Sequence, residues 1–246
     1  MYRALDSEAI VATCENLRKR IAERFPGSGL SGVSVELLAV ARESAARIDR
    51  LRRPYWPIRV AVILGLMVIV GATAGLILSM PFHTFVAGIS ELLQGLEAGI
   101  NDVIFISVAV YFLVTVENRL KRRAALRALH ELRSIAHVID MHQLTKDPEH
   151  LLAPTMGTAS SPKREMTRFG LARYLDYCSE MLSITSKVAA LYVQNLDDTV
   201  VLSTVNDVQS LATGLSAKIW QKIVILYTLA IRGDTPVLGT RVDPFQ

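Results

Sequence analysis

Residues 60–80 read VAVILGLMVIVGATAGLILSM, a run without a single charged side chain. A helix rises 1.5 Å per residue, so this run is long enough to cross the roughly 30 Å hydrocarbon core of a bilayer. Fifty-nine residues precede it, whereas a secretory signal lies at the extreme N-terminus and has a shorter apolar core. We therefore expect a transmembrane helix over residues 60–80, and a membrane protein.

A second apolar run, VIFISVAVYFLVTV at residues 103–116, is only about two-thirds of a spanning length. Residues 85–102 before it carry an apolar stripe at helical spacing. We therefore expect a second span over about 97–116 that begins inside this stripe. The alternative is an amphipathic helix in the interface, followed by a shorter, tilted span. Either way, residues 58–118 are predicted to form a transmembrane hairpin with a short external loop.

Basic residues predict the orientation of this hairpin. Six of them flank the two apolar runs: Arg52, Arg53, Arg59, Lys121, Arg122 and Arg123. Residues 81–102 between the runs contain no Lys or Arg, and this asymmetry places both termini in the cytoplasm. The membrane is the inner (plasma) membrane if the source is bacterial. The six side chains lie where anionic lipid headgroups attract them, so the lipid bilayer is the expected partner and nucleic acid is not.

The residues before the hairpin, 1–57, predict two helices joined by a loop. The first helix is expected over 7–25, where apolar residues recur at spacings of four and three before Pro26 and Gly27 interrupt the pattern. Gly29 and Gly32 are expected to extend this break. Ser34 is the predicted N-cap of a second helix over about 35–53.

After the hairpin the apolar spacing continues, which predicts a helix over 119–145 continuous with the second span. Prolines, glycines and serines mark residues 146–162 as a linker. Residues 163–231 are predicted to form an antiparallel helical pair, and residues 232–246 a flexible tail. The first helix of the pair has a coiled-coil-like stripe that must bury two faces: Leu171, Leu175, Cys178, Leu182, Thr185, Ala189 and Tyr192. Asp197, Asp198 or Thr199 caps the second helix.

The predicted fold class is therefore an all-α membrane protein, a multi-pass chain with a two-helix transmembrane hairpin and a cytoplasmic helical bundle. Strand-like alternation does not extend beyond a few positions. Both cysteines are expected on the cytoplasmic side, where a structural disulfide is not expected. The apolar spacing does not separate packing within one chain from packing between copies.

Histidines provide the main candidates for chemistry. Four of the five, at positions 130, 137, 142 and 150, lie close together in the sequence. His137 and Asp140 are three residues apart and can reach one ion, but two ligands do not make a selective metal site. We expect these histidines to form interhelical hydrogen bonds, and we expect no metal or other cofactor.

Arg123 and His130 resemble the Arg/His pair of HEPN-type ribonucleases, which are all-helical and use the pair at a dimer interface. The resemblance implies a nuclease site at these two residues. Ala124 departs from that family, which favours a polar residue after the Arg. Positive charge beside a cytoplasmic membrane surface is the other interpretation of Arg123.

Gly71 and Gly75 form a GxxxG motif in the first span, where small residues let helix backbones approach closely. Their neighbour is either the second span or the first span of another copy. The spans carry no ionisable group near the bilayer centre, which disfavours transport by a single hairpin. We therefore expect a membrane-tethered, self-associating helical scaffold or interaction protein with an unidentified cytoplasmic protein partner, and not an enzyme. The alternative is an oligomeric channel or pore gated by the bundle.

Overall fold

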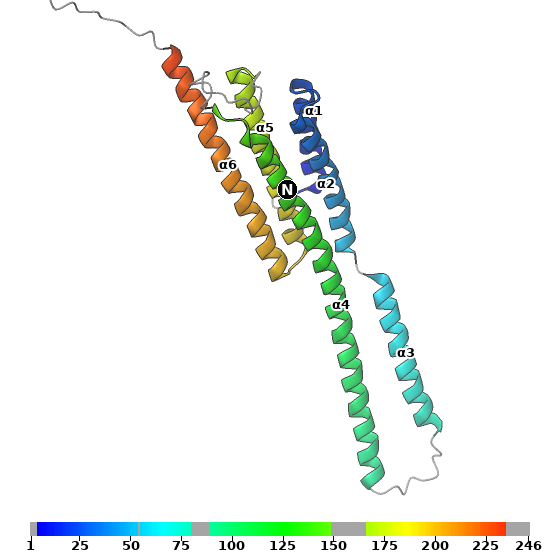
Figure 1. The fold of residues 1–246 in the computed structure, drawn as a ribbon. Coiled ribbons are helices and arrows are strands. Elements are labelled where there is room, and N and C mark those ends of the chain that lie inside the picture. The colour runs from blue at the N-terminus through cyan, green and yellow to red at the C-terminus, as the bar shows by residue number, and fades with distance from the viewer. Residues whose placement is uncertain (1–3, 54, 80–88, 149–165, 235–246) are drawn as a thin grey trace, which may run out of the picture. The chain divides into compact units, whose positions relative to one another are not determined.

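A computed structural model describes residues 4–53, 55–79, 89–148 and 166–234, and within these ranges all regular structure is helical (Figure 1). The helices are α1 (Ser7–Arg24), α2 (Gly29–Arg52), α3 (Trp56–Ser79), α4 (Ile89–Leu144), α5 (Arg168–Asn195) and α6 (Thr199–Asp234). The all-α prediction is confirmed. The chain divides into two compact units, one made of residues 1–48 and 126–246 and the other of residues 49–125.

The first unit is a helical bundle in which α5 packs against both α1 and α6. All seven residues of the stripe predicted on α5 are buried, and so are Met181, Ile184, Val188 and Leu191 beside it. The prediction that this helix buries two faces is confirmed. Its position between two neighbours explains the width of the stripe, because a helix with one neighbour needs only a single apolar face.

Polar and aromatic contacts join α1 to α5 at the surface of the bundle. Arg20 Nη2 lies 2.6 Å from Glu180 Oε2. Phe25, just after α1, makes edge-to-face contacts with Tyr174 and Tyr177 of α5 at centroid distances of 5.4 and 6.2 Å. Aromatic pairs of this geometry add about 0.5–1.5 kcal/mol beyond the apolar area that they bury.

Helix α2 begins at Gly29, several residues before the predicted start, and the prediction of Ser34 as its N-cap is wrong. The Ser28 hydroxyl accepts a hydrogen bond from the Ser31 backbone N–H at 3.2 Å, while Ser34 is buried in the helix and donates to the Ser31 carbonyl. Gly27 turns the chain with a φ of 68°, so the reversal is complete two residues before α2 begins. Gly29 is the first residue of the helix, and Gly32 lies inside it, where glycine costs only about 1 kcal/mol relative to alanine.

Asp198 is the cap of α6, one of the three residues proposed from the sequence. Its Oδ1 accepts hydrogen bonds from the backbone N–H groups of Val200 and Val201 at 2.9 and 3.1 Å. Helix α6 continues to Asp234, so the prediction of a flexible tail is wrong for residues 232–234. A single glycine at 233 does not end a helix this long, since its cost is about 1 kcal/mol. Residues 235–246 lie outside the described residues, as does most of the predicted linker 146–162.

The second unit contains α3 and the first part of α4. Within the described residues, one helical stretch, Gly95–Leu144, is long and apolar enough to cross a membrane by length and composition, and Arg59–Ala72 is a shorter apolar stretch. Helix α4 is a continuous helix of 56 residues. It begins at Ile89, before the predicted start of the second span, and therefore takes in the amphipathic segment that precedes the apolar run.

Candidate functional site

Most of the described apolar side chains of α3 and of the first part of α4 are exposed. In the most apolar window of Gly95–Leu144, none of the described residues is buried. Exposed fractions reach 76% at Leu78 on α3 and 74% at Tyr111 on α4. Water-soluble proteins rarely leave continuous apolar surfaces of this length uncovered, so these helices require an apolar environment or a partner.

Gly71 and Gly75 lie on α3 with open space beside them. Apart from the glycine itself, its chain neighbours and the backbone of its own helix, no heavy atom of the described residues lies within 4 Å of the position that a Cβ would occupy on either glycine. The small-residue surface is therefore available to a neighbouring helix. Its role in packing against another copy, or against the second span, stays a prediction.

The Glu117 carboxylate forms ion pairs with two of the six predicted basic residues, Arg59 and Lys121. Glu117, just beyond the predicted second span, lies 2.9 Å from Lys121 Nζ and 3.6 Å from Arg59 Nε. The hydrogen bond from Lys121 holds the pKa of the Glu117 carboxyl below its ordinary value, and the backbone N–H of Tyr55 acts in the same direction. Glu117 thus links the start of α3 to α4.

Sequence reasoning passed over Glu117, although a signal was present. It is the only acidic residue between positions 103 and 130, and it follows directly after the apolar run. A lone carboxylate among basic residues at the end of a predicted span indicates an ion pair that holds the two helices together there. Arg53 and Arg123 are exposed.

The histidine candidates are dispersed along α4. His130 and His137 are exposed, and Asp140 accepts a hydrogen bond from Gln143 Nε2 at 2.6 Å. Among the described residues, no group of three or more His, Cys, Asp or Glu side chains is placed to hold a metal ion. His150 lies outside these residues. A nuclease role for Arg123 and His130 stays a hypothesis drawn from the resemblance alone.

His142 has a packing role that the sequence did not indicate. Its imidazole lies against Gly29 at the start of α2, where an added Cβ would be 3.1 Å from Nε2. The His142 carbonyl accepts a hydrogen bond from the Tyr174 hydroxyl of α5 at 3.5 Å. His142 therefore lies where α2, α4 and α5 meet.

Both thiols are buried inside the bundle and are free. Burial raises the pKa of Cys14 to about 11 and that of Cys178 to about 12. Each is therefore protonated at neutral pH, and a protonated, enclosed thiol is a poor nucleophile.

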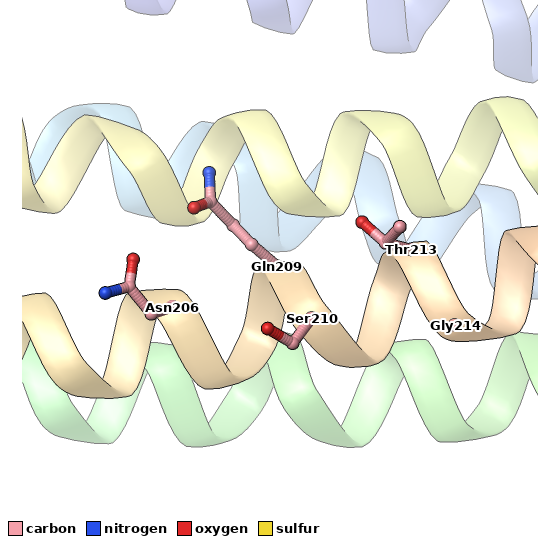
Figure 2. Close-up of a pocket in the computed structure, with 5 residues that line it drawn as sticks. All are labelled: Asn206, Gln209, Ser210, Thr213 and Gly214. Carbon is pink, nitrogen blue, oxygen red and sulfur yellow. The ribbon is translucent and has the colours of Figure 1, made fainter.

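A shallow groove of about 520 Å³ lies on the outer surface of α6 (Figure 2). Its lining comes from this single helix and is small and polar: Asn206, Gln209, Ser210, Thr213 and Gly214. The lining carries no charged side chain, which suits contact with a packed helix better than binding of an ion.

No protein-family model, no curated protein and no solved structure matches this chain. Its own sequence and structure are therefore the basis for inferring its function. Its described residues offer exposed apolar helices and an uncharged groove on α6.

Proposed function

We propose that this protein is a membrane-tethered helical scaffold that self-associates and presents its cytoplasmic bundle to a protein partner. The observation that carries the proposal is that none of the described residues in the most apolar window of Gly95–Leu144 is buried. Burial of apolar surface is worth about 25 cal/mol per Å², so a helix this apolar is stable when lipid covers it.

The membrane part is a hairpin of two spans, residues 60–80 and about 97–116. The ion pair of Arg59 with Glu117 supports this arrangement, because it joins α3 to α4 at the ends of the apolar runs, while Lys121 holds Glu117 within α4. Basic residues lie on that side and are lacking in residues 81–102, which places both termini in the cytoplasm. Anionic lipid headgroups attract the same basic residues.

The described serine and threonine hydroxyl groups of the second span are bonded to their own helix. Ser107 and Thr115 donate to the carbonyls of Val103 and Tyr111 in their own helix, at 2.7 and 2.8 Å. Hydroxyl groups that are satisfied in this way are compatible with a helix surrounded by lipid. Conductance of the reconstituted protein would instead favour the channel.

Topology tests the proposal directly. Single cysteines at Ser90 and Ser183 are labelled with an impermeant thiol reagent, and the wild type serves as control because Cys14 and Cys178 are buried. Ser90→Cys should label in intact cells, and Ser183→Cys only after the cells are opened. Labelling of Ser183→Cys in intact cells would overturn the hairpin. Co-purification from native membranes then identifies the cytoplasmic partner.

A further inference from the structure

Helix α6 carries a second stripe on the face opposite its buried one. The buried stripe includes Val201, Val205, Val208, Ala212, Leu215 and Ile219. The second stripe repeats at spacings of four and three without interruption, and all of its residues are exposed: Thr199, Ser203, Asn206, Ser210, Thr213, Ala217, Trp220, Val224 and Tyr227. We refer to these nine residues as the outer stripe.

The outer stripe is uncharged from end to end, although charged residues make up 20% of the chain. Exposed helix faces in water usually carry charged side chains. Apolar residues at a spacing of four and three form the contact surface of paired helices, and the second half of the stripe has them at Ala217, Trp220, Val224 and Tyr227. The outer stripe therefore has the periodicity and the composition of a helix interface.

The two halves of the outer stripe differ in side-chain size. The first half is small and polar and coincides with the groove lined by Asn206, Ser210 and Gly214 (Figure 2). The second half is bulky, and Trp220, Val224 and Tyr227 are exposed by 64%, 44% and 62%. An antiparallel pair of identical helices brings the bulky half of each over the small half of the other.

We propose that the outer stripe of α6 pairs with the same stripe of a second copy, in antiparallel orientation, with Ala217 at the two-fold axis. This inference rests on the self-association included in the proposed function. In this register Trp220 lies over Gly214 and Val224 over Ser210 of the other copy. Gly214 has no described atom within 4 Å of a Cβ position, so its surface is open to receive the indole ring. A closed two-fold contact needs such self-complementarity.

The size of the interface agrees with a tethered protein. Residues 199–227 form a stripe roughly 42 Å long and about 10 Å wide, which gives on the order of 400 Å² on each copy. The two copies together bury about 800 Å², which is less than the roughly 1,200 Å² of specific, stable complexes and corresponds to a weak contact. Attachment of both copies to one membrane raises their effective concentration, and an interface of modest size is then sufficient.

Disulfide cross-linking of the full-length protein in isolated membranes tests the pairing, because two cysteines join only when their Cα atoms approach to about 4.4–6.8 Å. Ala217→Cys should form a cross-linked pair by itself. Ser210→Cys and Val224→Cys should each fail alone and should cross-link when the two variants are expressed together. The wild type is the control, because its cysteines are buried.

Charge reversal provides a second measurement that does not require a disulfide. Ala217→Lys and Ala217→Glu each place two like charges at the axis, so each variant alone should shift to a smaller mass in mild detergent. A mixture of the two variants should recover the larger species. The exposure of Ala217 makes both variants compatible with folding.

Four outcomes overturn the pairing. Cross-linking of Ser210→Cys with itself would indicate a parallel arrangement. A cross-link to a different protein would assign the stripe to another partner. An oligomer that lacks any stripe cross-link would remove this inference and leave the proposed self-association to another surface. A monomer in mild detergent that is also uncross-linked in membranes would remove both.

Discussion

Gly29 and Gly32 are two glycines three residues apart in one helix, and their surroundings differ. A Cβ at Gly29 would lie 3.1 Å from His142 Nε2 and 3.2 Å from Cε1, whereas a Cβ at Gly32 would meet nothing within 4 Å. Gly32→Ala should therefore raise the free energy of unfolding by up to about 1 kcal/mol through helix propensity. Gly29→Ala should gain less than this or lose stability, because the imidazole must move. Thermal unfolding of the two variants measures the difference.

The same two variants in a His142→Ala background show whether the imidazole causes the difference in stability between Gly29→Ala and Gly32→Ala. Without the imidazole, the additional cost of Gly29→Ala should disappear, and a double-mutant cycle gives the interaction energy of the contact. An unchanged cost in that background would mean that the helix start, and not His142, disfavours the side chain.

Single residues were the least predictable level of this structure. Sequence reasoning chose Ser34 as a cap because a serine after several glycines resembles a helix start, but Ser28 performs that role. Both serines satisfy the capping preference, and only the turn made by Gly27 decides between them. His142 likewise cannot be distinguished from His130 and His137 by spacing, since its contact with Gly29 depends on where α2 begins.

At the scale of a helix, the packing of α5 depends on the buried stripe that the sequence predicts. Leu182 at its centre is fully buried, with an exposed fraction of 0%. Leu182→Ala should lower the free energy of unfolding of the bundle by about 2–5 kcal/mol through lost contacts and a residual cavity. The neighbouring Ser183 is exposed, so Ser183→Ala should change stability by no more than about 0.5 kcal/mol.

Resistance of the bundle to protease provides the measurement for both variants, and membrane insertion should be equal in the two. Equal resistance of Leu182→Ala and Ser183→Ala would mean that the stripe contributes little to packing. It would also contradict the central position of α5 between α1 and α6.

The buried stripes of α5 and α6 were predictable because apolar side chains at regular spacing have few other uses in a helix. The outer stripe of α6 has the same spacing but was missed, since half of it is Ser, Asn and Thr. Small polar residues are equally suited to water and to a closely packed helix. Only the structure shows that the whole set, from Thr199 to Tyr227, shares one exposed face.

For the whole molecule, two surfaces are available for self-association, the outer stripe of α6 and the glycines of α3. Sequence patterns predicted an all-helical chain and the glycine motif, but they do not tell whether a neighbour belongs to the same chain. The open space at Gly71 and Gly75 can receive either neighbour, so substitution has to distinguish them. The two surfaces lie in different units, so their contributions can be separated by substitution.

Gly71→Ile and Gly75→Ile should preserve membrane insertion, because both keep the span apolar, while the added side chain holds a neighbouring backbone away. In an Ala217→Lys background, which removes the α6 pairing, we expect either variant to shift the detergent-solubilised protein to a smaller mass by light scattering. Gly65→Ile is the matched control. It adds the same volume to another face of α3, and its surroundings are equally open. A constant mass with reduced thermal stability would instead assign the glycines to the second span of the same chain.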